Sequence, residues 1–316
     1  MRYLTSIISL VLLLSSCEDM QTVIDLELPP HQSKLVVNSS NKVDDKFKVY
    51  VSHSLDPLSN EDFEFHSDAT VLLFENQIAI DTLTFIDSSK FYKSNVRAEF
   101  EKSYSIRVNH PDYPLLNSKS LNAPPVTEIE TVNHTTTSTS GNVTSFIEID
   151  FDDNISEENF YLLKLVSYTH YLNENGDPQV VSTPIYFESS DPSLTNGSNG
   201  FDEEYGRKVM FNDQLFNGQT KRIELSYDNY YSEEDLEFGA EAESKIDSIE
   251  INLSTLDYDY YTYHTSRRLQ NNTSGGAIFG SEPVNVYNSF TNDNGSEDGY
   301  GLFSIISKDT FMLRID

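Results

Sequence analysis

The sequence predicts an all-β protein, mainly strands with one or two short helices, in which one β-sandwich is followed by a second β-rich, sandwich-like domain. Residues that favour turns recur about every eight to twelve positions, which is the spacing found in sandwiches and barrels. Between these turns, apolar and polar side chains alternate, as they do in half-buried strands. The length of 316 residues suits about two domains, and 37% hydrophobic residues are enough for their cores.

Charge and cysteine content exclude several classes of function. The chain has 51 acidic and 21 basic residues, which gives a formal charge of -30. We therefore expect no nucleic-acid partner, because a phosphate backbone requires Lys and Arg for neutralisation. The single cysteine rules out an intrachain disulfide framework and most thiolate metal sites.

The N-terminus predicts a lipid anchor. An apolar run from Leu4 to Leu14 is too short to cross a bilayer and is typical of a secretory signal. It ends in Leu14-Ser15-Ser16-Cys17, which resembles a bacterial lipobox, in which the cysteine becomes the lipidated N-terminus. We therefore expect a signal peptide at residues 1–16 and a lipidated tether at 17–33. The alternative is an ordinary signal peptide followed by an unmodified cysteine.

An acidic pair, Glu18 and Asp19, directly follows this cysteine. It resembles the export signal of surface lipoproteins in the Bacteroidota. The pair therefore predicts a protein anchored in the outer membrane and facing the cell surface. A retention signal for the inner membrane, or a solvated tether without a signal, would have the same acidic character.

We place the first domain at residues 34–123. Within Lys102–Asn109, the side chains of Tyr104, Ile106 and Val108 fall on one face, as in a half-buried strand. Glu75-Asn76-Gln77 suits a hairpin turn, and the two prolines of Ala123-Pro124-Pro125 exclude a central strand and mark the boundary. The expected strands are Lys34–Asn38, Phe47–His53, Ala69–Glu75, Ile78–Phe85 and Lys102–Asn109.

The second domain is placed at residues 124–316. Thr135–Ser140 and the run after Gly141-Asn142 suit a hairpin. Phe146–Phe151 sets its apolar side chains on one face, and we expect it to pair with Phe160–Tyr171, a long run rich in Leu, Val and Tyr. Ser189–Gly200 lacks apolar periodicity and predicts a mobile surface loop. Further strands are expected at Thr220–Tyr227 and Lys245–Leu253, on either side of the acidic stretch Glu233–Glu243.

One segment has helical periodicity. Ser254-Thr255-Leu256-Asp257 suits a helix N-cap with an acid three residues on, and a helix from about Leu256 to Asn271 follows. Its stripe of Tyr260, Tyr263, His264 and Arg267 could be an aromatic platform for a ligand. We favour the alternative that these side chains pack the helix against a sheet, which leaves Tyr258 and Tyr261 on the exposed side.

The order of these segments resembles the lipoprotein family called domain of unknown function 4249, over nearly the whole mature chain. The segments that carry the resemblance are Cys17, Val23–Pro29, Lys34–Val37, Ala69–Val71, Tyr104–Val108, Ala123–Pro125, Asn159–Tyr161, Tyr258–Tyr263, Glu282–Val284 with Tyr287-Asn288, and Gly299–Phe303. Two places depart from the family pattern. Val37-Asn38-Ser39-Ser40 lacks the Glu-Gly that commonly follows its Val-Val pair, and the insert Asn292–Asp298 replaces a tighter loop.

The resemblance implies an outer-membrane lipoprotein of the Bacteroidota whose gene often lies beside that of a TonB-dependent transporter. It also implies an immunoglobulin-like or transthyretin-like N-terminal sandwich. The family supplies no catalytic residues to carry over. A role in uptake is thus suggested by association alone.

No catalytic motif is present, and we predict no catalytic residue, no cofactor and no metal. The sequence lacks a G-x-S-x-G elbow, an H-E-x-x-H pair and a phosphate-binding glycine loop. An acylated Cys17 could not serve as a nucleophile. The histidines do not occur at metal-ligand spacing; they are His31, His53, His66, His110, His134, His170 and His264.

Two acidic clusters could supply oxygen ligands for calcium. They are Asp150, Asp152, Asp153 with Asn154, and Asp293, Asn294, Glu297 with Asp298. Neither cluster has the glycine and the distal glutamate that an EF-hand loop requires. We therefore interpret both as solvated loops.

The function expected from the sequence is non-catalytic binding, by a surface lipoprotein that is a ligand-binding or accessory subunit of a TonB-dependent uptake system. The candidate binding residues are Tyr258, Tyr261 and Tyr300, because tyrosine offers a large contact area at small entropic cost. Two alternatives stay open. One is a surface hydrolase that uses clustered carboxylates such as Asp152 and Glu157, and the other is a structural or adhesive lipoprotein.

Overall fold

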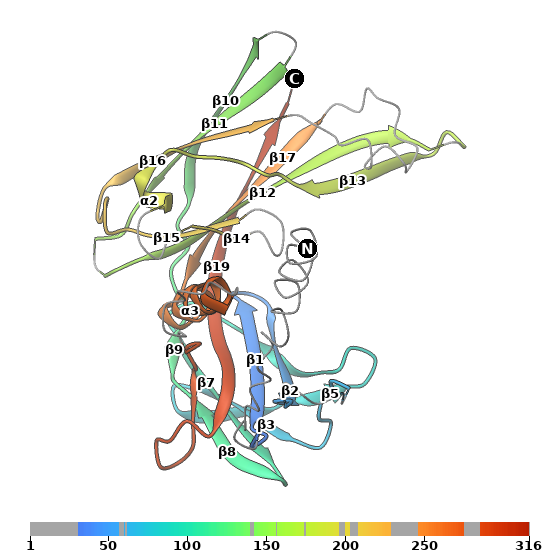
Figure 1. Ribbon diagram of the computed structural model, residues 1–316, viewed down its shortest axis with the longest axis vertical. Helices are drawn as coiled ribbons and strands as arrows, with labels where there is room; N and C mark the ends of the chain where they lie inside the picture. Colours follow the sequence, from blue (N-terminus) through green and yellow to red (C-terminus); the bar gives the residue numbers. More distant parts are fainter. Residues whose placement is uncertain are drawn as a thin grey trace, which may run out of the picture.

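The protein is built almost wholly from strands, so the all-β prediction is confirmed. The computed structural model describes residues 31–56, 60, 62–139, 142–155, 157–173, 175–195, 200–202, 208–228, 246–274 and 285–315. Two sandwich-like halves lie end to end along the long axis, with one helix at the waist between them (Figure 1). No helix in these residues is both long and apolar enough to span a membrane.

The elements of the described chain have the following bounds. They are β1 (Leu35–Lys42), β2 (Lys46–His53), β3 (Thr70–Glu75), β4 (Ile78–Thr82), β5 (Thr84–Ile86), β6 (Phe91–Arg97), β7 (Ser103–His110), β8 (Tyr113–Ser118), β9 (Leu121–Asn122), β10 (Ile129–Thr139), β11 (Asn142–Asp152), β12 (Phe160–Leu172), β13 (Pro178–Pro184), α2 (Pro192–Thr195), β14 (Gly200–Asp202), β15 (Lys208–Asn212), β16 (Thr220–Asp228), β17 (Ser248–Leu256), α3 (Tyr258–Ser274), β18 (Phe290–Thr291) and β19 (Gly299–Arg314).

One sheet runs through both halves of the molecule. Its strand order is β14-β15-β12-β17-β19-β1-β2-β6-β5, with β13 beside β12. The last strand, β19, pairs in parallel with β1 over Gly299–Ile306 and antiparallel with β17 over Ser307–Arg314. The expected division at residues 123 and 124 falls in the connection between β9 and β10. Two segments that follow this division in the sequence, β18 and the first half of β19, belong to the lower half and complete its sheets.

The lower half is a sandwich around one apolar core. A second sheet, β18-β8-β7-β3-β4 with β9 beside β7, faces β1, β2 and β6. Tyr104, Ile106 and Val108 are buried in this core, as the alternation predicts. The β3–β4 hairpin turns at Asn76 and Gln77, whose φ angles of 49° and 68° suit a tight hairpin turn.

The upper half is a sandwich of β12, β17 and the end of β19 against the sheet β10-β11-β16. The predicted β10–β11 hairpin is confirmed, but the predicted pairing of β11 with β12 is wrong. β11 lies between β10 and β16, and it meets β12 across the core, where the rings of Phe151 and Tyr161 are 5.2 Å apart. Two strands that each bury one face can meet face to face as well as edge to edge, and alternation in sequence does not distinguish the two.

The predicted helix is confirmed as α3, although its cap lies three residues later than expected. The backbone N–H of Tyr260 donates to Oδ1 of Asp257 at 2.7 Å, so Asp257 is the N-cap. Ser254 cannot cap the helix because it lies within β17, where it is paired with both β12 and β19.

The expectation of a mobile loop over Ser189–Gly200 is wrong for the described part of it. Residues 196–199 lie outside the described chain, but the segment before them is anchored. Leu194 in α2 is fully buried in the upper core, and Asp191 pairs with Lys221 at 2.5 Å. Ser189 donates to the carbonyl of Glu224 at 2.6 Å. One buried leucine and local polar contacts fix a segment that has no apolar period.

Candidate ligand pocket

The helix α3 is held to the outer face of the shared sheet by an apolar cluster of its own. Phe160, Leu256, Leu302 and Ile306 pack there with the buried Tyr260 and Tyr261. The ring of Tyr261 stacks on Phe160 at 4.5 Å between centroids. The expectation that Tyr261 is exposed is therefore wrong, because the sheet contacts two adjacent helix positions. Tyr258 is 56% exposed, as expected.

Asp257 connects this helix to β19. One oxygen caps the helix through Tyr260, and the other accepts the backbone N–H of Ile305 at 2.6 Å. Burial raises the pKa of Asp257 to about 7, although the two backbone N–H groups oppose that shift. The start of the helix is thus fixed by one buried carboxyl group.

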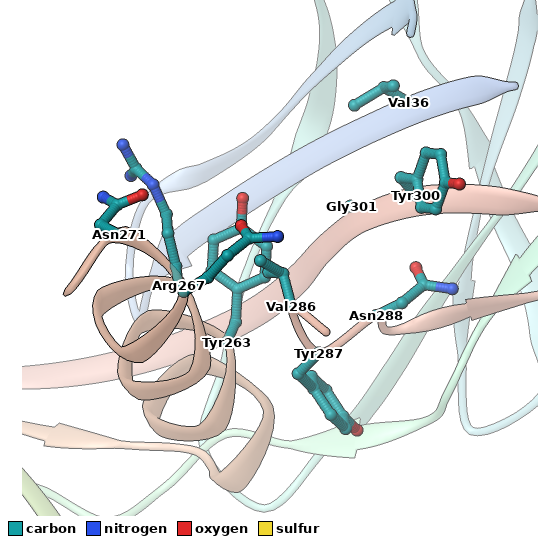
Figure 2. A pocket seen from close by; sticks show the side chains of 10 residues that line it. Val36, Tyr263, Arg267, Asn271, Val286, Tyr287, Asn288, Tyr300 and Gly301 are labelled. Carbon is teal, nitrogen blue, oxygen red and sulfur yellow. The ribbon is translucent and has the colours of Figure 1, made fainter. Parts of the chain in front are cut away.

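A pocket of about 290 Å³ lies beside the later turns of the helix. One wall is a helix face that carries Tyr263, Arg267, Gln270 and Asn271, at the spacing of residues on one side of a helix. Opposite it lies the segment Val286–Asn288, and the floor is formed by β1 and β19. Figure 2 shows Tyr263 and Arg267 extending from the helix on one side, with Tyr300 on the strand across from them.

The floor depends on the parallel pairing of β1 with β19. Val36 and Tyr300 are Cα partners in this pairing, and both line the pocket. Gly301 follows with a φ of 133°, and a Cβ atom on it would lie 1.8 Å from the carbonyl oxygen of Val37. Only glycine permits this approach. The amine of Lys34 lies over the Tyr300 ring, 5.1 Å from its centroid.

The wall formed by Val286–Asn288 is attached to the helix through Tyr287. Its backbone N–H donates to Oγ of Ser266 at 2.9 Å, and its hydroxyl donates to Oδ1 of Asp259 at 2.8 Å. The amine of Lys119 contacts the same hydroxyl and lies over the ring, 4.8 Å from its centroid. Burial and the Asp259 carboxylate raise the pKa of Tyr287, so this phenol stays protonated at neutral pH.

The lining residues determine which chemistry the pocket offers. They supply one guanidinium, from Arg267, with the amides of Gln270 and Asn271 and the phenols of Tyr263 and Tyr300. The hydroxyl of Tyr287 is bonded to Asp259, and the amide of Asn288 is bonded to the backbone of Phe290. Among the lining residues that the structure describes, none carries a carboxylate, an imidazole or a thiol. This set can bind a small polar or anionic molecule through hydrogen bonds and one positive charge.

The sequence-predicted residues fall into three groups. Tyr300 lines the pocket, whereas Tyr258 and Tyr261 are not among its lining residues. Cys17, Glu18 and Asp19 lie outside the described residues. Sequence reasoning missed the role of Tyr263 and Arg267, which it assigned to packing with Tyr260. Their separation of four positions showed that Tyr263 and Arg267 lie on one face of the helix. Which face packs against the sheet depends on the tertiary structure and cannot be inferred from this spacing.

Five of the carboxylates proposed for calcium or hydrolysis accept hydrogen bonds from other side chains. Asp150 receives two bonds of 2.7 Å from Arg222, which holds the pKa of Asp150 below its usual value. Asp152 accepts the hydroxyl of Thr220 at 2.5 Å, and Asp153 accepts the hydroxyl of the buried Tyr161. In the second cluster, Asp293 accepts the amide of Asn117 at 2.9 Å, and Asp298 that of Asn292. Among the described residues, neither acidic cluster brings three of its carboxylates close enough together to hold a metal ion.

Comparison with known proteins gives one family. A family model described as "Domain of unknown function (DUF4249)" matches residues 21–311. No curated protein matches the chain. A solved structure titled "Complete structure of manganese lipoxygenase of Gaeumannomyces graminis and partial structure of zonadhesin of Komagataella pastoris" is 11% identical and covers 89% of this chain and 94% of that chain, with a TM-score of 0.18. That TM-score supports no argument about fold or function.

Proposed function

Because the chain belongs to the DUF4249 family and has a polar pocket beside α3, we propose that it is a non-catalytic ligand-binding lipoprotein that serves a TonB-dependent uptake system in the outer membrane. Its lipid is attached at Cys17, and it faces the cell surface through the Glu18-Asp19 signal. The observation that carries the proposal is the composition of the pocket lining.

For a chain of formal charge -30 the described lining residues are unusual, because they include the cation Arg267 and no acid. The surrounding negative charge disfavours anions in general. A guanidinium has five N–H donors, so Arg267 can donate a hydrogen bond to an acceptor-rich group besides its contacts within the protein. The pocket therefore suits a small molecule with a carboxylate or several carbonyl or hydroxyl oxygens.

Non-catalytic binding is favoured because the described part of the lining includes no carboxylate or imidazole to act as general base and no thiol or aliphatic hydroxyl to act as nucleophile. Of the carboxylates considered for a hydrolase, Asp152 accepts the hydroxyl of Thr220, and its neighbours Asp150 and Asp153 accept from Arg222 and Tyr161. A hydrolase is therefore the weaker proposal.

The position of the pocket suits a protein tethered to a membrane. His31 and Ser33 already contact the carbonyl of Ser54, and Lys34 follows directly beside Tyr300 of the pocket. The part of the tether before them, residues 17–30, reaches at most about 50 Å when fully extended. This reach allows the pocket to approach a transporter in the same membrane.

The pocket is tested with full-length protein purified from detergent-solubilised outer membranes. Wild type, Arg267→Ala with Tyr300→Ala, and the control Leu269→Ala are compared; Leu269 lies on α3, is 42% exposed and does not line the pocket. We expect native mass spectrometry to show a retained small molecule in wild type and control but not in the double variant. Equal retention by all three proteins would contradict the pocket assignment, and turnover of a glycan, peptide or ester would contradict a non-catalytic role.

The same membranes test the partner and the anchor. We expect a TonB-dependent transporter to co-purify with wild type. Cys17→Ala should release the protein from the membrane fraction, because the attached lipid is the proposed anchor. Glu18→Ala with Asp19→Ala should protect it from protease added to whole cells. A membrane-bound Cys17→Ala variant would disprove the lipid anchor.

A further inference from the structure

Three histidines that are far apart in the sequence meet at one end of the lower sandwich. His53 ends β2, His66 follows the bridge that Phe65 makes with Ser52, and His110 ends β7. Asp68 lies just before β3. One ligand-capable atom from each of His66, Asp68 and His110 lies within 4.8 Å of the other two. Among the residues that the structure describes, these three form the one group of His, Cys, Asp and Glu side chains that is close enough to hold a metal ion.

The backbone around this cluster is fixed by specific contacts. The N–H of His66 donates to the carbonyl of Val51 at 2.8 Å, and the carbonyl of His66 accepts the hydroxyl of Tyr92 at 3.0 Å. The ring of Tyr113 lies 5.7 Å from that of His66 and 5.1 Å from that of His110. The ligand positions are therefore established by the sandwich itself and need no ion to form.

The side chains are already placed as a ligand set. His110 is only 3% exposed, and its Nε2 lies 3.1 Å from Oδ1 of Asp68. Nε2 of His66 lies 3.1 Å from Nδ1 of His53. A hydrogen bond to the second ring nitrogen is the usual way in which a protein orients a metal-binding histidine. The carboxylate of Asp68 is exposed, so an ion can enter from solvent.

We propose that His66, Asp68 and His110 bind one divalent first-row transition ion, for which zinc is the reference, and that His53 orients His66. Two imidazoles and one carboxylate match this class of ion, whereas calcium and magnesium require oxygen ligands throughout. Metal–nitrogen bonds of about 2.0–2.1 Å place tetrahedral ligands about 3.3 Å apart, so small side-chain rotations close the site. A fourth position remains for water or another group.

Binding requires one rearrangement of protons. Nδ1 of His110 accepts the backbone N–H of Asp112 at 3.1 Å, so Nε2 carries the ring proton and donates to Asp68. When Nε2 binds the ion, the ring proton is on Nδ1 and the Asp112 N–H loses its acceptor. Metal binding therefore replaces the Asp112–His110 and His110–Asp68 hydrogen bonds with bonds from His110 and Asp68 to the ion. The ring proton of His110 moves from Nε2 to Nδ1, so the number of protons on His110 does not change.

The test uses the full chain, stripped of metal by chelator dialysis, with zinc, cobalt and calcium as probes. Isothermal titration should show one zinc per chain and no binding of calcium. Replacement of a ligand, in His66→Ala or Asp68→Asn, should lower zinc affinity more than about a hundredfold. His53→Ala should lower it about 10- to 100-fold, the usual effect of losing an orienting partner. Bound cobalt should show the absorption of a site with nitrogen and oxygen ligands in wild type.

The matched control is His170→Ala. His170 lies 3.1 Å from Asp247, so it forms a His–Asp pair like that of His110, but it does not belong to the three-residue cluster. Its loss should leave zinc affinity unchanged. Asp68→Asn lies at an exposed carboxylate and should keep the metal-free thermal transition of wild type, so its effect reports on the ion. No zinc binding to wild type, or equal binding by Asp68→Asn and wild type, would overturn the site and leave a purely structural His–Asp cluster.

Discussion

The two halves of β19 are neighbouring stretches of one strand in quite different surroundings. From Gly301 to Ser307 every residue is buried. Phe303 and Ile305 face the lower core, while Leu302 and Ile306 face α3. From Lys308 to Arg314 the strand alternates, with Phe311 and Leu313 packed against the upper core and Met312 49% exposed.

The difference shows what the helix contributes. A strand covered on both faces reads as a continuous apolar run, whereas a strand covered on one face alternates. α3 supplies the second cover at the waist (Figure 1), and the pocket lined by Tyr263, Arg267, Gln270 and Asn271 lies beside its later turns. α3 covers Leu302 and Ile306 but leaves Tyr300 of the same strand uncovered, and the pocket lies where this cover ends.

The largest effect should come from Gly301→Ala, which breaks the covered half. The new Cβ would lie 1.8 Å from the carbonyl oxygen of Val37, at a φ of 133°. We expect a loss of at least about 4 kcal/mol in unfolding free energy, measured by urea denaturation. Gly176→Ala is the control, because its φ is 82° but nothing lies within 4 Å of the added atom. It should cost about 1–2 kcal/mol. Similar losses in both variants would show that the close approach to Val37 is not decisive.

A matched pair on the strand tests the difference in cover directly. Leu302 is 4% exposed beneath the helix, and Met312 is 49% exposed on the same strand. Leu302→Ala should lower the free energy of unfolding by about 3 kcal/mol, because it leaves a cavity. Met312→Ala should change it by less than about 0.5 kcal/mol. Equal effects in thermal or urea unfolding would refute the two-sided burial of the first half.

The upper half can be examined through the segment that sequence alone assigned to a mobile loop. Leu194 is fully buried in the core that the second half of β19 borders, whereas Leu215 of a nearby connection is 55% exposed. Leu194→Ala should cost about 2.5 kcal/mol and Leu215→Ala almost nothing. If calorimetry shows no change for Leu194→Ala, the segment does not close the upper core.

The smallest expected loss of stability at a single pH comes from Asp257, which links α3 to the covered half. The ordinary pKa of an aspartate is about 3.9, whereas Asp257 has a pKa of about 7 when folded. Between these values the folded protein holds a proton that the unfolded chain releases, so this group makes stability fall as pH rises from about 4 to 7. Asp257→Asn should cost about 1–2 kcal/mol through the weakened cap. It should also remove this part of the pH dependence, which is measured as the difference between the two proteins in urea unfolding at pH 5 and pH 7.5. Parallel pH profiles would show that Asp257 does not titrate in this range.

Local patterns in the sequence predicted part of the strands in both sandwiches, but not β6, β8, β13, β15 or β19. The single strand expected over Ile78–Phe85 is wrong, because the chain passes there from β4, paired with β3, to β5, paired with β6 in the other sheet. Alternation predicted which faces of β7 and β11 are buried, and turn residues predicted the β3–β4 and β10–β11 hairpins. These features depend on neighbours within a few positions, where side-chain period and turn chemistry act. The order of short segments along the chain was enough to identify the family, whose model matches residues 21–311.

Only the tertiary structure decided what lies against each face. It placed β11 across the core from β12, set β19 in both sandwiches, and turned Tyr261 to the sheet but Arg267 to the pocket. It also joined His66 to His110 across 44 positions, which no spacing rule for metal motifs covers. The physical reason is that a strand or helix face encodes that it must be buried, whereas its partner is chosen by packing and pairing among segments distant in the sequence.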